Sequence, residues 1–311
     1  MESETVFHTG YAALVGEPNV GKSTLMNAIL NQKISIVTKK PQTTRHKIMG
    51  ILSGENFQVI FLDTPGLISP KYLLQEVMMK FASSALDDAD VVLFLVDAEK
   101  ARSVGVQESA RALEKVMSVH LPSAGKKTFL VINKIDRVEK SDVLPMIDGL
   151  RKAFPFDEIL PISALNSFGT GELVATIVKY LPESPPFYPP DIVSDAPEKF
   201  FVSEIIREKI FEQFAQEIPY STTVDIVAFT ERTAKKHFIS AEIFVERQSQ
   251  KGILIGKKGA VLKKLGEQAR TEIESFLGHA VFLELHVKVR EKWRGSEAWL
   301  KRLGYGNQIK N

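Results

Sequence analysis

Glycine, lysine and serine residues near the start of the chain follow the spacing G-x-x-x-x-G-K-S, from Gly16 to Ser23. Backbone N–H groups bind phosphate oxygens most closely where glycines, here Gly16 and Gly21, remove the side chains. Lys22 would place a cation on the outer phosphates, and Ser23 would offer a hydroxyl to Mg2+. An apolar run of strand length precedes this loop and a helical pattern follows it. The pattern therefore predicts a phosphate-binding loop between a strand and a helix.

A second group of candidates, Asp63-Thr64-Pro65-Gly66, follows the buried strand pattern of residues 57–62. A carboxylate at the end of such a strand can complete a Mg2+ shell, which assigns Asp63 to the metal. Gly66 leaves its N–H unobstructed for a γ-phosphate. The motif alone is common in turns, and its pairing with the phosphate loop makes the prediction specific.

A third group of residues predicts which nucleotide base the protein binds. Asn133-Lys134-Ile135-Asp136 follows the strand pattern of residues 128–132. Asp136 can accept hydrogen bonds from the N1–H and the 2-amino group of guanine, while Asn133 binds another edge of the base. Adenine lacks that donor pair and would leave a buried carboxylate unpaired. The backbone of Ser163-Ala164-Leu165 could also contact the base.

The segment from residue 34 to residue 47 is too long for a tight turn and is polar. Such a segment is typical of a functional loop. Its hydroxyl groups, Thr43 and Thr44, are candidates for completing the Mg2+ shell when a third phosphate is present.

Strand and helix patterns alternate through the first half of the chain. Residues 48–52 and 57–62 read as a hairpin. Further strands are expected at residues 91–96, 128–132 and 158–161, and helices at residues 72–86, 106–119, 141–153 and 171–180. These patterns predict an α/β fold with a doubly wound, mostly parallel sheet, one antiparallel strand, and a ligand site outside the carboxyl ends of the strands.

The length and composition are typical of an ordinary soluble protein with two domains. The chain has 311 residues, 25% of them charged and 44% hydrophobic. It contains no cysteine, which excludes disulfides, thiol catalysis and cysteine-based zinc sites. We expect a cytoplasmic protein without a signal peptide or a transmembrane segment, because no basic start with an apolar core and no run of about 18 apolar residues occurs.

Six prolines between residues 182 and 197 mark a domain boundary. Such proline density is typical of a semi-rigid linker, although a proline-rich ligand is an alternative. We therefore predict a first domain at residues 1–181, a linker at 182–197 and a second domain at 198–311. The halves differ in charge, with 20 basic and 23 acidic residues up to position 197 and 20 basic and 15 acidic residues after it. The second half is the one expected to meet a polyanion.

The second half has an α+β pattern. An amphipathic helix is expected at residues 197–217, capped by Ser194 or Asp195 and burying Phe201, Ile205, Ile206, Ile210 and Phe214. Strands at 222–231 and 236–247, helices at 249–254 and 260–276, and a strand at 281–289 follow.

Gly256-Lys257-Lys258-Gly259 joins the last two helices, and from Arg247 to Lys264 there are six basic residues and no acidic one. Glycines that flank lysines let a sugar-phosphate backbone approach while its charge is neutralised, as in a KH module. The alternative is a simple turn between helices. Lys263 adds charge, Ile253 and Ile255 would line the groove for the bases, and Ile243 and Val245 would extend it.

Basic and aromatic residues interleave in the tail, where Arg290, Lys292 and Arg294 accompany Trp293 and Trp299. Such a pattern can stack bases and bind phosphates. We assign the three cations to the RNA groove, whereas Trp299 is expected to pack on the domain core.

The nucleotide motifs of the first half resemble those of translation-factor-related GTPases. The resemblance implies Mg2+ bound by Ser23, Asp63 and a switch threonine, for which we favour Thr44 over Thr43, and catalysis by Lys22, Thr44 and Gly66. The implied GTP-binding residues are Gly16, Glu17, Pro18, Asn19, Val20, Gly21, Lys22, Ser23, Thr24, Asp63, Thr64, Pro65, Gly66, Asn133, Lys134, Asp136, Ser163, Ala164 and Leu165.

One position departs from the Ras-like pattern. Leu67 stands where those enzymes place the glutamine that orients the attacking water. An aliphatic side chain cannot orient water, so we expect slow intrinsic hydrolysis that depends on a partner, bound RNA or a cation. Asn19 matches an asparagine that helps to bind K+ in potassium-dependent relatives; the alternative is a loop residue that bonds its own backbone.

A GTPase domain followed by a type II KH domain resembles the Era family over nearly the whole chain. The resemblance implies a GTP-hydrolysing switch in small ribosomal subunit assembly that binds the single-stranded 3′ end of small-subunit rRNA. Two alternatives stay open. One is an RNA adaptor whose nucleotide site is structural, and the other is a regulatory GTPase that associates peripherally with the inner face of the cell membrane through its basic surface.

Overall fold

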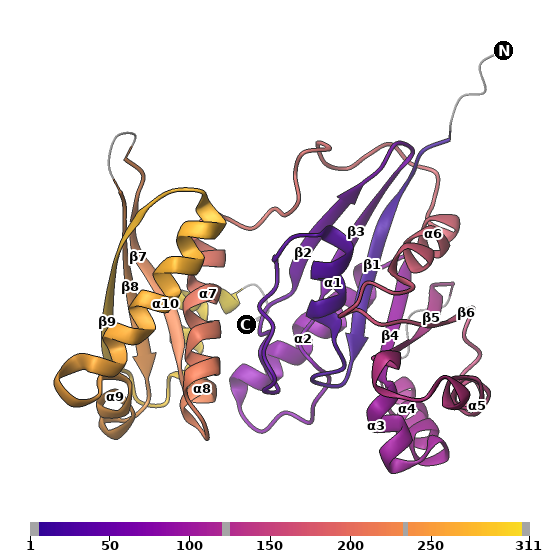
Figure 1. Ribbon diagram of the computed structural model, residues 1–311, viewed down its shortest axis with the longest axis horizontal. Coiled ribbons are helices and arrows are strands. Elements are labelled where there is room, and N and C mark those ends of the chain that lie inside the picture. The colour runs from indigo at the N-terminus through magenta and orange to yellow at the C-terminus, as the bar shows by residue number, and fades with distance from the viewer. Residues whose placement is uncertain (1–5, 120–124, 233–235, 307–311) are drawn as a thin grey trace. The chain divides into compact units, whose positions relative to one another are not determined.

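The computed structural model describes residues 6–119, 125–232 and 236–306. The chain divides into two compact units (Figure 1). The first contains the described residues up to Ser35, Thr44–Ser69 and Met78–Asp195; the second contains Ile36–Thr43, Pro70–Val77 and the described residues from Ala196 onward. Ile36–Thr43 and Pro70–Val77 thus belong to the second unit, although we predicted them, and Thr43 with them, in the first domain.

The first unit contains a six-stranded sheet with the order β2-β3-β1-β4-β5-β6. Only β2 runs antiparallel, because it forms the predicted hairpin with β3. The strands β1, β3, β4 and β5 are nearly continuous apolar runs, as strands covered on both faces must be. The bounds are β1 His8–Gly16, β2 Ile48–Ser53, β3 Phe57–Asp63, β4 Val91–Asp97, β5 Lys127–Asn133 and β6 Glu158–Pro161.

Helices cover both faces of this sheet. A core cluster buries apolar side chains from α2 (Leu73–Asp88), α4 (Val106–Val119) and α5 (Lys140–Leu150) on one face. The helices α1 (Lys22–Leu30) and α6 (Thr170–Tyr180) contact each other and β1. The predicted doubly wound α/β fold is confirmed. The short helix α3 (Ala98–Val104) was not predicted.

The proline-rich stretch differs from a free linker, because residues 182–194 pack along the first unit. The buried side chain of Gln58 bonds the backbone of Phe187 and Tyr188. Further along, Ile51 N–H donates to the carbonyl of Val193 at 2.8 Å. The prolines lack N–H groups, and the residues between them make these bonds instead. We call residues 182–194 the strap.

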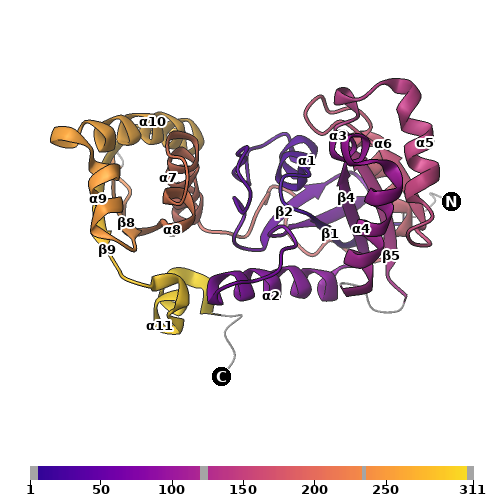
Figure 2. The same cartoon turned by 90° about the horizontal axis from the view of Figure 1, so that it is seen from below.

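The second unit contains a three-stranded sheet with the order β7-β8-β9, in which β7 and β8 are antiparallel and β8 and β9 parallel (Figure 1). Helices α7 and α10, labelled in Figure 2, pack against it around one apolar core. This is the predicted α+β arrangement. The bounds are α7 Glu198–Gln213, α8 Ile218–Ser221, β7 Thr223–Thr230, β8 His237–Val245, α9 Gln248–Ile255, α10 Ala260–Leu277, β9 Val281–Val289 and α11 Glu297–Leu300.

The start of α7 corrects one prediction. Neither Ser194 nor Asp195 caps the helix, whose N-cap is Pro197 without a side-chain hydrogen bond. The hydroxyl of Ser194 donates to the carbonyl of Met49 at 2.6 Å, so it fastens the strap instead. The predicted core positions are all buried, namely Phe201, Ile205, Ile206, Ile210 and Phe214.

Candidate nucleotide and RNA sites

The predicted phosphate loop lies between β1 and α1. Gly21 is the N-cap of α1 with φ 99° and makes no side-chain cap hydrogen bond. A Cβ atom at Gly21 would lie 2.3 Å from Nδ2 of Asn133, so both the backbone conformation and the close approach require glycine. Backbone N–H groups at the start of a helix bind anions. The loop therefore has the geometry of a phosphate site.

Lys22 is buried beneath this loop. Its Nζ donates to the carbonyls of Gly16 at 3.1 Å and Glu17 at 2.9 Å. Burial lowers the pKa of Lys22 to about 8, against the opposing effect of the Asp63 and Glu17 charges. A phosphate at the loop would add the negative charge that favours the protonated lysine.

Three oxygen-bearing side chains meet at one point of the first unit. Ser23 Oγ lies 2.6 Å from Asp63 Oδ2 and 3.0 Å from Thr44 Oγ1. Ser35, which sequence reasoning missed, donates to the same carboxylate at 2.9 Å. Thr43 instead contacts Thr38 Oγ1 at 2.7 Å. The structure thus brings Thr44, and not Thr43, beside Ser23 and Asp63.

The donor set of this point suits Mg2+, a cation that prefers oxygen ligands. Asp63 is fully buried, and its Oδ1 has no hydrogen-bond partner among the described residues. Burial raises the pKa of Asp63, while the bonds from Ser23 and Ser35 and the charge of Lys22 oppose the rise. A cation at Oδ1 would satisfy the orphaned oxygen and favour the ionised form.

The motif at Asp63 approaches the phosphate loop closely. A Cβ atom at Gly66 would lie 2.7 Å from backbone atoms of Pro18, so only glycine fits. The N–H of Leu67 donates to the carbonyl of Gly16 at 3.0 Å. The side chain of Leu67 is buried in the sheet core, where it cannot orient a water molecule. Thr64 fixes the segment by donating to the carbonyl of Leu14 at 2.7 Å.

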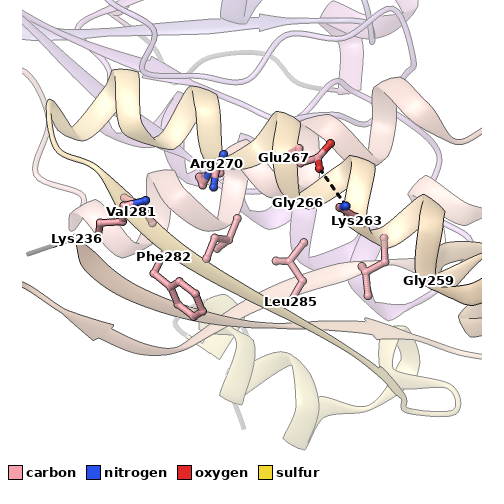
Figure 3. Close-up of a pocket in the computed structure, with 11 residues that line it drawn as sticks. Lys236, Gly259, Lys263, Gly266, Glu267, Arg270, Val281, Phe282 and Leu285 are labelled. Atoms are coloured by element: carbon pink, nitrogen blue, oxygen red, sulfur yellow. Dashed lines mark ion pairs between the residues drawn. The ribbon is translucent and has the colours of Figure 1, made fainter.

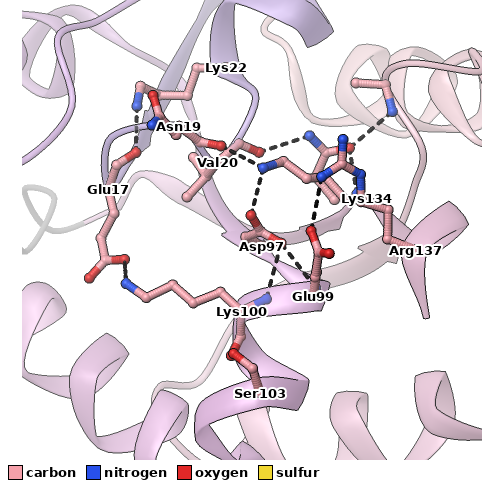
Figure 4. A network of polar contacts seen from close by, with 12 residues as sticks. Glu17, Asn19, Val20, Lys22, Asp97, Glu99, Lys100, Ser103, Lys134 and Arg137 are labelled. Atoms are coloured by element: carbon pink, nitrogen blue, oxygen red, sulfur yellow. Dashed lines mark hydrogen bonds and ion pairs between the residues drawn. The ribbon is translucent and has the colours of Figure 1, made fainter. Parts of the chain in front are cut away.

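Residues 133–136, the predicted guanine-binding segment that we call the base loop, are joined to their predicted neighbours (Figure 4). Asn133 donates from Nδ2 to the carbonyl of Val20 at 2.9 Å and accepts from the N–H of Ala164 at 2.9 Å. Ser163 Oγ donates to Asp136 Oδ1 at 2.5 Å, which orients that carboxylate. Lys134 Nζ donates to the carbonyl of Asn19 at 2.7 Å. One fold thus holds the phosphate loop and the base loop together.

The other predicted nucleotide residues lie in the same loops. Val20 and Pro65 are buried, Thr24 is half-buried on α1, and Leu165 is 70% exposed beside the base loop. The structure therefore brings the predicted nucleotide residues of the first unit to the carboxyl ends of the strands.

The Gly-x-x-Gly segment lies between α9 and α10, as predicted. Lys257 and Lys258 are exposed, and Lys258 has the left-handed φ of 52° that turns its side chain away from a regular helix. Ile253 is 51% exposed on α9, whereas Ile255 is half-buried and packs against the core. The loop can present cations and apolar surface together.

A cavity of about 470 Å³ adjoins this loop in the second unit (Figure 3). It contains the predicted Gly259 and Lys263. Sequence reasoning missed its other lining residues; an exposed aromatic, Phe282, at an outward position of β9 was the available signal. The remaining lining residues are Lys236, Leu262, Gly266, Glu267, Arg270, Val281, Phe282, Leu283 and Leu285.

Two residues expected to extend the groove do not. Ile243 and Val245 are fully buried on the core face of β8, because alternate positions of a covered strand point inward. Trp293 is also fully buried, and its Nε1 donates to the carbonyl of Ser221 at 2.9 Å, so it cannot stack on a base. Trp299 packs on Phe244 with ring centroids 5.3 Å apart, as expected for a residue docked on the core.

The three tail cations lie outside the lining of the cavity. Arg290 stacks over Trp299, with 5.2 Å between its guanidinium carbon and the ring centroid. Arg294 pairs with Glu246 at 2.5 Å, which compensates its charge. Lys292 is exposed with a left-handed φ of 53°. Of the three, Arg290 and Lys292 present exposed charge.

Two family models match the chain. The model described as a 50S ribosome-binding GTPase matches residues 11–134, and the KH domain model matches residues 217–294. Among curated relatives, the GTPase Era of Geobacter metallireducens is 47% identical over 304 residues, which cover 97% of this chain and 99% of the relative. The chloroplastic GTPase ERA-like protein of Arabidopsis thaliana is 46% identical and is covered to 70%.

Two solved Era structures are similar to nearly the whole chain. A variant of Era from Aquifex aeolicus bound to GDP·AlF4⁻ superposes with a TM-score of 0.90 at 41% identity, covering 96% of this chain and 99% of that one. An Era complex with MgGDPNP and nucleotides 1506–1542 of 16S ribosomal RNA has the same identity, coverage and TM-score. Among the described residues, no helix combines the length and apolar character that crossing a membrane requires.

Proposed function

Because this chain belongs to the Era family of GTPases, we propose that it couples GTP hydrolysis to binding of the single-stranded 3′ end of 16S rRNA during small ribosomal subunit assembly. One observation carries the proposal. A single chain holds both the convergent candidate nucleotide residues and a Gly-Lys-Lys-Gly loop with exposed lysines beside a cavity that apolar and charged residues line. A related Era has been solved with both MgGDPNP and that rRNA region, which supports the choice of ligands.

The nucleotide site is proposed to bind GTP and GDP with Mg2+. Ser23, Thr44 and Asp63 would hold the metal, which supplies charge neutralisation at the phosphates when bound. Lys22 would bind the outer phosphates, and the N–H of Gly66 would bind the γ-phosphate. Catalysis then consists mainly of positioning and of stabilising charge, because phosphoryl transfer needs little covalent participation by the protein.

Water must be positioned by something other than Leu67, whose side chain is buried. We propose that K+ near Asn19 contributes to this step. The left-handed backbone of Asn19, with φ 65°, places this residue at the turn of the phosphate loop, where its own carbonyl accepts from Nζ of Lys134. Turnover measured in potassium and in sodium buffers of equal ionic strength tests the idea, and equal rates would remove K+ from the mechanism.

The RNA site is proposed to comprise the Gly-x-x-Gly loop and the adjoining cavity. Lys257 and Lys258 would neutralise phosphates, while exposed apolar groups such as Ile253 and Phe282 would contact bases. Both kinds of contact favour single strands, whose unstacked bases expose their faces. The order of the elements in this unit supports a type II KH module.

We propose that the protein is cytoplasmic, with partial peripheral association at the inner face of the cell membrane through its basic surface as the alternative. Flotation with anionic vesicles, in the presence and absence of competing RNA, tests this alternative. Vesicle binding that RNA displaces supports a shared basic surface. Failure to float would remove the membrane alternative.

The central experiment measures GTP turnover with and without a short single-stranded RNA from the 3′ end of 16S rRNA, in potassium buffer. We expect the RNA to stimulate turnover. The double variant Lys257→Asp with Lys258→Asp should keep GTP binding and lose the stimulation. Arg151→Asp with Lys152→Asp, an equal charge reversal at exposed positions of the first unit, is the control and should behave as wild type. RNA affinity that survives the lysine reversal would refute the assignment of the loop.

A further inference from the structure

The first turn of α3 contacts both nucleotide loops, although it contains none of the predicted nucleotide residues. Asp97, at the end of β4, bonds Lys134 of the base loop, with 2.6 Å between Oδ2 and Nζ. Lys100 pairs with Glu17 of the phosphate loop. Figure 4 shows these contacts on the two sides of one helical turn.

The position of Asp97 follows from the sheet. In the register of β4 and β5, Asp97 lies opposite Asn133, so its side chain emerges directly beside the base loop. Its Oδ1 accepts from the N–H groups of Glu99 at 2.9 Å and Lys100 at 3.2 Å, which caps α3. The same carboxylate thus uses one oxygen to start the helix and the other to hold Lys134.

Lys134 connects Asp97 to the phosphate loop. Its Nζ also donates to the carbonyl of Asn19 at 2.7 Å, and its left-handed φ of 66° directs the side chain across the site. Asp97 is 14% exposed and Lys134 is 24% exposed, so solvent screens this pair far less than a surface pair. A third contact, Arg137 to Glu99 at 2.9 Å, ties the flank of the base loop to the same turn.

We propose that the first turn of α3 is a brace that holds the phosphate loop and the base loop at the spacing of a bound nucleotide, with Asp97 as its principal positioning residue. The proposal rests on the proposed nucleotide site. Asp97 touches neither the phosphates nor the base; it fixes the ammonium group of Lys134 and, through it, the carbonyl of Asn19. Its loss should therefore weaken nucleotide binding, and in sodium buffer, where the proposed K+ near Asn19 is absent, it should leave the chemical step unchanged.

The test uses Asp97→Asn in the full chain. Asparagine is as good an N-cap as aspartate, so α3 keeps its start while the charge that holds Lys134 is lost. We expect fluorescently labelled GDP to dissociate about tenfold faster, because the oxygen that accepts from Lys134 is replaced by an NH2 group and the charge-assisted hydrogen bond is lost. In sodium buffer the KM for GTP should rise while kcat is unchanged. Asp148→Asn, the same substitution at an exposed pair with Arg151, is the control.

A double-mutant cycle separates the brace from a role in capping. If Asp97 acts through Lys134, Asp97→Asn should not accelerate release further in a Lys134→Gln background. Full additivity, or a wild-type release rate for Asp97→Asn, would overturn the proposal.

Lys100→Gln gives an independent test should the Asp97 variant not fold, because Lys100 is exposed. It should release GDP about threefold faster, as expected for a partly screened pair. A wild-type rate for this variant would count against the brace. A wild-type protein that bound no GDP would instead refute the nucleotide site itself.

Discussion

The buried side chain of Gln58 should decide whether the strap is held on the first unit in solution. Its Nε2 donates to Ser53 Oγ at 3.0 Å and to the carbonyl of Tyr188 at 2.8 Å. Its Oε1 accepts from the N–H groups of Phe187 at 2.8 Å and Tyr188 at 2.9 Å. Gln58→Leu has a similar volume and can make none of these four bonds. Three backbone groups of the strap would lose their partners.

The expected magnitude follows from those three groups. A hydrogen bond contributes about 1 kcal/mol net, so a strap that stayed in place would cost about 3 kcal/mol. Detachment lets water satisfy the groups, so the strap should open instead. The amides of Phe187 and Tyr188 should then exchange about 100-fold faster, because about 1.4 kcal/mol corresponds to a factor of ten.

Hydrogen exchange followed by mass spectrometry, with urea unfolding alongside, measures both effects. Ser53→Ala removes only the bond within the sheet edge and is the matched control, with a loss of about 1 kcal/mol or less and normal protection of the strap. Unchanged protection at Phe187 and Tyr188 in Gln58→Leu would refute the reasoning. It would also return the whole stretch of residues 182–197 to the status of a linker.

Three further outcomes are expected. Thr44→Val should weaken the Mg2+-dependent binding of a non-hydrolysable GTP analogue at least about tenfold, whereas the affinity of Thr43→Val should stay within about threefold of wild type. Titration calorimetry measures both affinities. The reverse order of the two effects would assign the metal ligand to Thr43. Burial raises the pKa of Tyr11 to about 12 from 10.0. The contribution of this shift to the free energy of unfolding is therefore fully present below pH 10 and is lost as the pH rises through 12. Urea midpoints should therefore fall less steeply above pH 10 in Tyr11→Phe, and parallel curves would contradict this. Trp293→Phe should destabilise the second unit by about 2 kcal/mol in urea unfolding, because the carbonyl of Ser221 loses its donor; an unchanged midpoint would show that the bond contributes nothing.

Local patterns were sufficient for much of the fold. The apolar runs at β1, β3, β4 and β5 predicted a parallel sheet, and the helix at residues 106–119 has the observed bounds of α4. The family prediction is confirmed by relatives that are 45–47% identical over nearly the whole chain. These signals are visible because periodicity and motif spacing are properties of neighbouring residues.

Features that depend on distant partners could not be predicted. The helix α3 buries only Ala98 and Ala101, which is too little apolar surface to give a period. The serine chosen as a helix cap bonds Met49 instead, and the strap depends on Gln58, which is over 120 residues away in the chain. Buried charges on α7, at Glu204, Arg207 and Glu208, occupy positions that a helical pattern assigns to solvent.

The candidate nucleotide site was predictable by residue type, whereas its supports were not. Ser35 and Asp97 belong to no recognisable motif, and they act through contacts with Asp63 and Lys134 that only the fold creates. The RNA groove could likewise be predicted only in part. Its loop was evident from two glycines and two lysines, but its wall on β9 needed the pairing of strands.

The orphaned Asp63 Oδ1 has a thermodynamic consequence. A ligand that binds only the folded unit and gives this oxygen a partner raises the free energy of unfolding by about 2.7 kcal/mol at a hundred times its Kd. A first unit that binds guanine nucleotide with Mg2+, as proposed, should therefore resist heat and proteases more strongly as the nucleotide concentration rises.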